Sequence, residues 1–406
     1  MDGTCNLKCK YCYLERFGET LYPLKLRKQR QILENGKLVV DWLVENGFTP
    51  SMEIFSGEPT IKPIFYEFVD YIIEKYKDKE KKPTIVVPTN MTFILYPDLV
   101  DKMEKLIIKG RQNGINIVLS ASIDGKFMEQ NRPFKVESAD KRDDDYYDKV
   151  FEFAKKWGIG FHPMVYGENI EKWKLNFLWF QEMFKKHDIP FDAIYLLEVR
   201  NAEWTREQMK EFGEFLKFLI KWTFNNIFNG DKEKFVRFLF DRRGYNILNP
   251  FSKVGRGLGC SIQSTMFVRL GDLSIVPCHR TSYEKFVYGR FVVKDGKIVD
   301  IEALNPELML AIYSYDAKNS PYCSTCPIKN VCSHGCLGSQ YEITGDLFTP
   351  IPTVCALEHV KIFSIIEALK EIGVLSIVRN MVHESVKNDI DNVLELMENG
   401  WKGPVL

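Results

Sequence analysis

Three cysteines lie close together at the start of the chain, in the stretch MDGTCNLKCKYCYLE. Cys5, Cys9 and Cys12 follow the spacing CxxxCxxC, and three thiols cannot all pair with one another as disulfides. Thiolates at this spacing can wrap a short loop around one cubane iron–sulfur cluster, so that three irons gain a ligand and the fourth stays open for chemistry. Zinc is the alternative, but it needs a fourth Cys or His close by, and the nearest histidine is His162.

No cysteine occurs between Cys12 and Cys260, and seven follow from there. Scattered core cysteines would not gather at both ends of a chain, whereas metal binding in a reducing compartment explains this distribution. A zinc ribbon built from CxxC pairs is an alternative for the tail, although the run CxxCx5Cx3C has a different rhythm. The seven are Cys260, Cys278, Cys323, Cys326, Cys332, Cys336 and Cys355.

The composition is that of a globular protein and disfavours two kinds of partner. Hydrophobic residues make up 45% and charged residues 27% of the 406 residues, and the 55 basic residues balance the 55 acidic ones. A neutral chain lacks the basic footprint of a nucleic-acid binder. No stretch approaches the ~18–20 apolar residues of a membrane helix, and the first residues do not resemble a secretion signal. We therefore expect a cytoplasmic protein without nucleic-acid or membrane partners.

Between about 51 and 198 the sequence alternates short β-rich runs with longer amphipathic stretches. Repeated βα units predict a parallel sheet with its active face at the carboxyl ends of the strands. Five candidate strands are too few for an eight-stranded barrel, which leaves a partial barrel or an open sheet. The strands are expected at Met52–Phe55, Thr84–Pro88, Ile115–Ser122, Gly160–Val165 and Ala193–Glu198, and the helices at about 28–46, 62–77, 97–113, 145–157, 170–187 and 205–228.

The stretch CNLKCKYCYLE resembles the signature of radical S-adenosylmethionine (SAM) enzymes, in which the open iron chelates the amino and carboxylate groups of SAM. Tyr11 fills the aromatic position that is typical before the last cysteine of that signature. FSGEP resembles the family's glycine-glycine-glutamate-proline motif, which receives the SAM amino group, with a serine in place of the first glycine. The resemblance implies a cofactor-binding turn made of Ser56, Gly57, Glu58 and Pro59.

Further candidate SAM ligands follow the next strands, by the same resemblance. PTNMT and SASIDGKFMEQNR resemble family segments that contact SAM, which implies roles for Asn90, Ser122, Asp124 and Arg132. Taken singly, each could equally be a polar residue that closes a turn at a strand end. Glu198 and Arg200 end the last candidate strand, where they could contact SAM or substrate or form a surface ion pair.

The cysteines of the tail resemble those of the SPASM extension of radical SAM enzymes. The resemblance assigns one auxiliary [4Fe-4S] cluster to Cys260, Cys278 and Cys336, with Met266 where some relatives have a further cysteine. It assigns a second auxiliary cluster to Cys323, Cys326, Cys332 and Cys355, so that the three clusters of the chain use all ten cysteines. In LGDLSIVPC, Leu273 stands where a glycine is usual, and Gly271-Asp272 is expected to make a hairpin turn.

The implied architecture is α/β: a partial (β/α)6 TIM-like barrel with a C-terminal Cys-rich SPASM domain that contains a β-hairpin, cluster-binding loops and helices. The domains are expected at 1–204 for the barrel, 205–250 for a helical connector and 251–406 for the SPASM domain with the last helices. Because only four residues precede Cys5, we expect this chain to lack a leader-binding domain and the first strand of the family barrel. Either another segment takes the place of that strand or the chain is truncated.

The resemblance implies that a reduced cluster transfers one electron to SAM, which releases methionine and a 5′-deoxyadenosyl radical that abstracts hydrogen from a substrate. A peptide or protein substrate and a flavodoxin- or ferredoxin-type electron donor are implied. Cross-linking of a ribosomally made peptide, through a thioether or carbon–carbon bond, is the leading hypothesis.

Formylglycine formation in a sulfatase is the alternative within the enzyme class. In the similar maturases, an Asp that serves as the base directly follows the cysteine that corresponds to Cys278. Here His279 could act as that base or simply pack beside the cluster. Methyl transfer and peptide epimerisation stay open. A non-catalytic iron–sulfur electron carrier is the alternative of another class, but it leaves the SGEP and Asn90 turns unexplained.

Overall fold

The computed structural model describes residues 2–55, 57–191, 193–231 and 260–400, together with 234 and 258. The chain divides into two compact units, each made of three segments. Neither unit coincides with a predicted domain, because the chain passes between the units several times. Unit 1 contains Met1–Ile123, Arg132–Phe161 and Ile262–Tyr313, and unit 2 contains Asp124–Asn131, His162–Ser261 and Ser314–Leu406.

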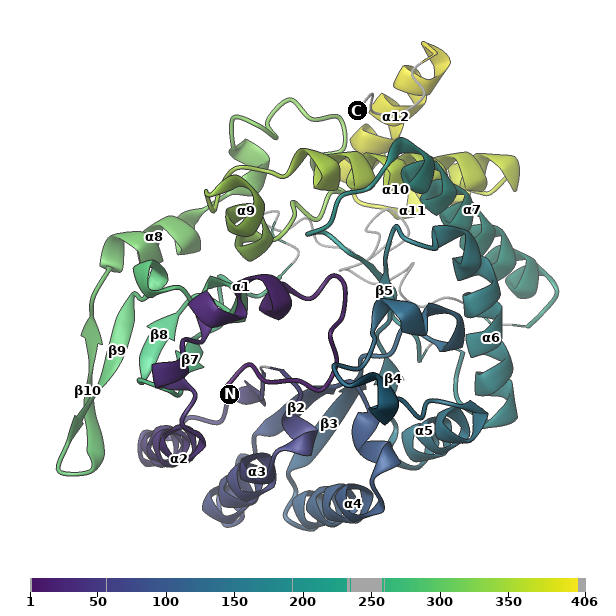
Figure 1. Cartoon of the computed structure of the whole chain (residues 1–406). Helices are drawn as coiled ribbons and strands as arrows, with labels where there is room; N and C mark the ends of the chain where they lie inside the picture. Colours follow the sequence, from purple (N-terminus) through teal and green to yellow (C-terminus); the bar gives the residue numbers. More distant parts are fainter. Residues whose placement is uncertain are drawn as a thin grey trace. The chain divides into compact units, whose positions relative to one another are not determined.

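A four-stranded parallel sheet in the order β1-β2-β3-β4 organises the first part of unit 1 (Figure 1). Ile85 and Val87 alternate with less buried neighbours along β2, as expected for a strand with two different faces. Helices α3 and α4 each begin at a proline, whose missing N–H has no partner in a first helical turn anyway. The elements are α1 (Tyr13–Leu21), α2 (Gln29–Glu45), β1 (Ser51–Glu53), α3 (Pro63–Tyr76), β2 (Thr84–Thr89), α4 (Pro97–Gln112), β3 (Asn116–Ala121), α5 (Asp144–Trp157) and β4 (Gly160–Phe161).

A second, antiparallel sheet in unit 1 has the order β10-β9-β8-β7. The predicted hairpin turn at Gly271-Asp272 is confirmed, with Val268 opposite Ile275. Leu273 has the left-handed φ of 60°, which explains why a glycine is usual there, and its buried side chain joins the apolar cluster under this sheet. The elements are β7 (Phe267–Arg269), β8 (Ser274–Val276), β9 (Gly289–Lys294), β10 (Lys297–Ala303) and α8 (Pro306–Ser314).

Unit 2 contains a short parallel pair, β5-β6, and the helices α7 and α10, of 23 and 20 residues. Thr205 and Gln208 form a reciprocal capping box at the start of α7, which packs against α10 (Figure 1). No helix in the described ranges is long and apolar enough to cross a membrane. The elements are β5 (Met164–Val165), α6 (Trp173–Lys186), β6 (Leu197–Glu198), α7 (Arg206–Phe228), α9 (Leu337–Thr344), α10 (Pro352–Glu371), α11 (Leu375–Met381) and α12 (Glu384–Glu398).

The parallel pairing and the repeated βα order agree with the predicted partial barrel, and most predicted element bounds lie within two residues of the observed ones. One predicted strand, Gly160–Val165, is instead two short strands interrupted at His162-Pro163. Proline cannot donate a ladder hydrogen bond, so a continuous central strand is disfavoured there. The end of the predicted connector, 235–250, and the start of the predicted SPASM segment, 251–257, lie outside the described residues.

Candidate functional site

Two backbone hydrogen bonds hold the loop of the first three cysteines against residues 133–135. Lys8 donates its backbone N–H to the carbonyl of Pro133 at 2.8 Å, and Lys135 donates to the carbonyl of Asn6 at 2.9 Å. Cys12 stands at the N-cap position of α1, where burial raises the pKa of its thiol and the first backbone N–H groups of the helix lower it by less. None of these three thiols is in a disulfide, and all three residues are partly buried.

The turn that follows β1 approaches this loop at backbone distance. Gly57 has a φ of 61°, and a Cβ built on it would lie 1.9 Å from the carbonyl oxygen of Thr4. Glu58 donates its backbone N–H to that same carbonyl at 2.9 Å. Only glycine permits this contact, which fixes the position of Cys5 relative to the turn. Pro59 starts a short 3-10 turn, and Ser56 lies outside the described residues.

Glu58 is 1% exposed, and hydrogen-bond donors of the protein surround its carboxylate. One oxygen accepts from the backbone N–H and hydroxyl of Thr60 at 3.2 and 2.6 Å and from the Thr89 hydroxyl at 2.8 Å. The other accepts from the backbone N–H of Asn90 at 2.6 Å. Burial raises the pKa of this group in spite of these bonds. Glu58 therefore holds the ends of β1 and β2 together, and its role toward SAM stays a prediction.

Asn90 connects the end of β2 to the cysteine loop. Its side-chain amide donates to the side-chain oxygen of Asn6 at 3.0 Å and lies 3.7 Å from the sulfur of Cys5. Asn6 in turn donates to the hydroxyl of Thr92 at 2.9 Å. Asn6 was not predicted, because an asparagine between two cysteines of a predicted metal site has no distinctive spacing of its own.

Four further residues predicted to bind SAM are divided between the two units. The guanidinium of Arg132 lies 5.4 Å from the ring centre of Tyr11, and both side chains are buried. Ser122 donates its backbone N–H to the carbonyl of Thr89 at 2.7 Å, at the end of β3. In unit 2, the carboxylate of Asp124 accepts the backbone N–H of Met164 at 2.9 Å. Tyr11, Ser122 and Arg132 thus belong to the unit of the cysteine loop, whereas Asp124 belongs to the other unit.

His279 is packed among aromatic rings in unit 1. Its ring stacks on Phe55 at 3.8 Å between centres, and its Nδ1 lies 2.9 Å from the hydroxyl of Tyr13. Burial, together with the charge of Arg280, lowers the pKa of His279 to about 3. These contacts favour a packing role, and the catalytic base stays a prediction.

Four tail cysteines line one cavity of about 170 Å³ in unit 2: Cys323, Cys326, Cys332 and Cys355. Burial, together with the charges of Cys323 and Cys326, raises the pKa of the Cys355 thiol to about 11. No three Cys, His, Asp or Glu side chains in the described part of the chain converge as ligands of a single ion. A cavity lined by four thiols has the donors that a four-iron cluster needs, and the assignment of these four cysteines to one cluster stays a prediction.

The other three tail cysteines do not fall in one unit. Cys260 and Cys336 belong to unit 2 and Cys278 to unit 1. Cys336 precedes α9, and Cys278 precedes a 3-10 turn at His279–Thr281. Their joint cluster stays a prediction.

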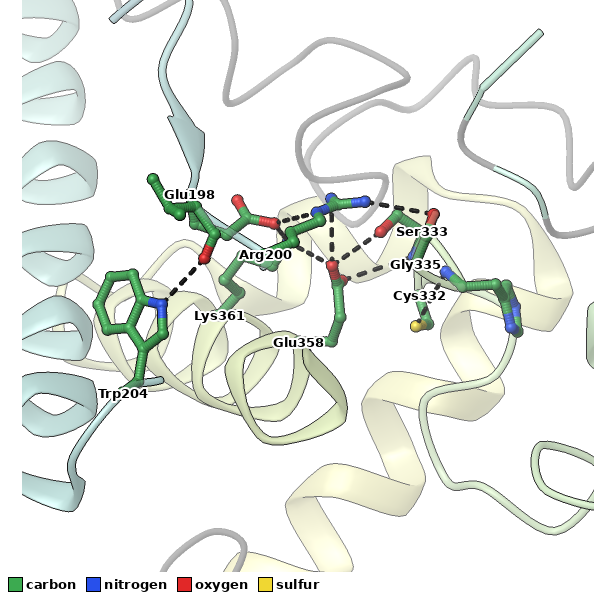
Figure 2. A network of polar contacts seen from close by, with 10 residues as sticks. Glu198, Arg200, Trp204, Cys332, Ser333, Gly335, Glu358 and Lys361 are labelled. Carbon is green, nitrogen blue, oxygen red and sulfur yellow. Dashed lines mark hydrogen bonds and ion pairs between the residues drawn. The ribbon is translucent and has the colours of Figure 1, made fainter. Parts of the chain in front are cut away.

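A buried network of four charged side chains lies next to the cysteine cavity, within unit 2 (Figure 2). The Lys361 ammonium lies 3.0 Å from Glu198 and 2.6 Å from Glu358, and Arg200 lies 2.8 and 3.4 Å from the same two carboxylates. Burial alone would raise the pKa of Glu198, but the charges of Lys361 and Arg200 outweigh it and lower that pKa to about 2. We call these four residues the charge quartet.

The charge quartet reaches the loop between Cys332 and Cys336. Glu358 accepts the hydroxyl of Ser333 at 2.7 Å, and Arg200 donates to the carbonyl of Gly335 at 3.4 Å (Figure 2). Glu198 and Arg200 are therefore not a surface ion pair, since the Glu198 side chain is 3% exposed and that of Arg200 is 18% exposed, and both contact charged residues of α10. Contact with SAM or substrate stays a prediction for both. Glu358 and Lys361 were missed, because nothing in the apolar pattern of α10 marks them as partners of a strand far away in sequence.

Comparison with known proteins extends the local findings. The sequence profile of the Radical SAM superfamily matches residues 3–176. Over 73 residues the chain is 37% identical to the antilisterial bacteriocin subtilosin biosynthesis protein AlbA of Bacillus subtilis (strain 168). That match covers 18% of this chain and only 14% of AlbA.

The fold is similar over almost the whole chain to solved structures of anSMEcpe. The form with bound AdoMet gives a TM-score of 0.62 at 17% identity, with 96% of each chain covered. The form with bound AdoMet and the Kp18Cys peptide gives 0.61 at 17% identity, with 93% of this chain and 97% of that one covered. At this identity the likeness concerns the fold.

Proposed function

We propose that the chain is a radical SAM enzyme that cleaves S-adenosylmethionine reductively in order to modify a peptide or protein, and the match of the Radical SAM superfamily profile to residues 3–176 is the premise. The specific proposal is cross-linking of a ribosomally synthesised peptide through a thioether or carbon–carbon bond. The subtilosin biosynthesis protein among the relatives supports a peptide substrate.

One observation carries the proposal: the ends of β1 and β2 hold the cysteine loop at fixed positions. The Gly57 turn contacts the backbone of Thr4, and Asn90 contacts both Asn6 and Cys5. A loop that only bound a structural metal would not need polar residues from two neighbouring strand ends. A non-catalytic electron carrier leaves this convergence unexplained.

The site would hold a [4Fe-4S] cluster on Cys5, Cys9 and Cys12, with SAM on the open iron. The chemistry available there is one-electron cleavage of the sulfonium bond, which yields methionine and a 5′-deoxyadenosyl radical. Burial and the nearby charge of Glu58 raise the pKa of Cys5 to about 11, so the free thiol stays protonated and cluster assembly must release that proton. The neighbouring amide of Asn90 is a donor that can then support the thiolate.

The test is anaerobic reconstitution followed by addition of SAM and dithionite. We expect about twelve irons per chain, since each cluster of this type has four, and release of 5′-deoxyadenosine. The matched control is Cys12→Ala, which should lose about four irons and all SAM cleavage while the tail iron stays. Intact SAM with a full complement of iron would instead support the electron carrier.

The product then separates the two modification hypotheses. A cross-link removes two hydrogen atoms from a cysteine-containing peptide, whereas formylglycine formation removes the sulfur of the cysteine. Mass spectrometry of a synthetic peptide after incubation distinguishes these outcomes. A reduced flavodoxin or ferredoxin in place of dithionite tests the proposed electron donor, and fractionation of cells tests the proposed cytoplasmic location.

A further inference from the structure

His334 lies between two proposed cluster ligands, Cys332 and Cys336, in the loop CSHGC. Its backbone is in the left-handed region, with a φ of 55°, which costs energy for any residue with a Cβ. Its backbone N–H donates to the sulfur of Cys332 at 3.2 Å. Such strain persists where surrounding contacts impose it, and it is most frequent at functional sites.

The side chain of His334 lines the cavity that holds four cysteines, and the residue is 7% exposed. Its Nε2 lies 2.7 Å from the carbonyl oxygen of Lys329. A carbonyl can only accept, so Nε2 carries the proton and Nδ1 presents a lone pair. That Nδ1 is buried and has no hydrogen-bond partner among the described residues.

This arrangement is the one that metal-ligating histidines use. One ring nitrogen donates to a backbone carbonyl, which selects the tautomer, and the other nitrogen is left to bind the metal. A second acceptor at the same cavity, the side-chain oxygen of Gln340, is also buried without a partner in the part of the chain that the structure describes. Two buried acceptor atoms without a partner among the described residues, next to four cysteines, indicate that the cavity binds an electron-poor group.

We propose that His334 is a nitrogen ligand of the metal centre in this cavity, which makes it a mixed cysteine–histidine site. The proposal rests on the proposed function, because it assumes an iron–sulfur cluster bound by the tail cysteines. Five donors then compete for the four terminal positions of a four-iron cluster, and one thiol is left off it. A neutral imidazole in place of a thiolate raises the reduction potential of such a centre.

The test uses the full chain with Cys5, Cys9 and Cys12 replaced by Ala, so that only tail iron remains. After anaerobic reconstitution and reduction, pulsed electron paramagnetic resonance measures nitrogen coupled to the cluster spin. We expect a strongly coupled nitrogen that changes isotope signature when the histidines are labelled with ¹⁵N. Backbone N–H groups that donate to sulfur give only weak coupling and do not respond to that label.

His334→Gly should abolish this coupling and lower the reduction potential without loss of iron. Glycine tolerates the positive φ, and four thiols remain to fill the cluster. His334→Asn, which also tolerates that conformation, checks the result with a side chain present. His359→Ala is the matched control, since the Nε2 of His359 lies 3.9 Å from the sulfur of Cys326 in the same cavity.

Iron in the tail without a strongly coupled histidine nitrogen would overturn the proposal, as would coupling that survives in His334→Gly or vanishes in His359→Ala. The absence of tail iron would overturn the cluster assignment in the proposed function, and the inference with it. The iron count tells these two failures apart.

Discussion

The residue at position 57 decides whether the first cysteine loop and the SGEP turn can meet. A Cβ at Gly57 would lie 1.9 Å from the oxygen and 2.5 Å from the carbon of the Thr4 carbonyl, so the two backbones would have to separate. We predict that Gly57→Ala loses about four of about twelve irons and all release of 5′-deoxyadenosine. Iron analysis and product detection measure both effects.

The matched control is Gly47→Ala. Gly47 also has a positive φ, 73°, but a Cβ there would have no neighbour within 4 Å. The substitution carries only the conformational cost of roughly 1–2 kcal/mol and should retain iron and SAM cleavage. If Gly47→Ala and Gly57→Ala lose activity equally, backbone conformation and not close approach is the decisive factor.

At this scale, sequence reasoning located the thiols and the strand-end polar residues but not their partners. Glu58 was predicted from a motif, whereas the donors that fill its carboxylate, Thr60 and Thr89, are ordinary residues that only the fold brings together. His334 could have been found from one signal, a histidine between two cysteines of the CxxxC pair, but its left-handed backbone and its fixed tautomer are properties of the folded loop.

At the scale of elements, the charge quartet joins β6 to α10. We predict that Lys361→Met destabilises the chain by about 3–5 kcal/mol, because it leaves two buried carboxylates with only Arg200 as a counter-charge. Chemical unfolding monitored by circular dichroism measures the change. The control is Lys221→Met, which removes an exposed pair with Glu371 between α7 and α10 and should cost less than about 1 kcal/mol.

Acid should weaken the same connection. The pKa of Glu198 is lowered from 4.5 to about 2, so its stabilising contribution is fully present above about 4.5 and is lost as the pH falls towards about 2. In the wild type this protonation leaves Lys361 and Arg200 without one counter-charge, whereas in Lys361→Met it removes an unbalanced carboxylate. We therefore expect the stability difference between the two proteins to shrink across that pH range in unfolding measurements without iron. A constant difference would show that Glu198 is not ionised in the folded state.

Elements were easier to predict than connections between them. Periodicity placed α4 and β2 almost correctly, because an amphipathic helix and an alternating strand repeat a local signal. The link from Arg200 to Glu358 has no such signal, since it joins residues 158 positions apart. The interruption at His162-Pro163 was visible in the sequence as a proline, and the prediction of one continuous strand ignored it.

At the scale of the whole molecule, the proposed tail cluster would couple metal binding to folding. Between α8 and α9 the chain runs from 315 to 336 with one short 3-10 turn, Ala317–Asn319, and this stretch carries Cys323, Cys326, Cys332 and Cys336. A long irregular segment in a compact unit has low local stability unless something else holds it. Cluster binding would provide that stability, because the free energy of metal binding is then also free energy of folding.

We predict that removal of iron by a chelator makes trypsin cleave after Lys318 and Lys329 at least about tenfold faster, since a structural metal contributes far more than ~1.4 kcal/mol. The internal control is the exposed turn between β9 and β10, where Lys294 and Lys297 should be cut at the same rate with and without iron. Mass spectrometry of the fragments over time gives both rates in one sample.

Equal protection of Lys318 and Lys329 in both forms would mean that the protein contacts around the cavity, such as those of Glu358 and Ser333, hold the segment without metal. Faster cutting there alone would place a structural metal among the tail cysteines, independently of any activity of the enzyme.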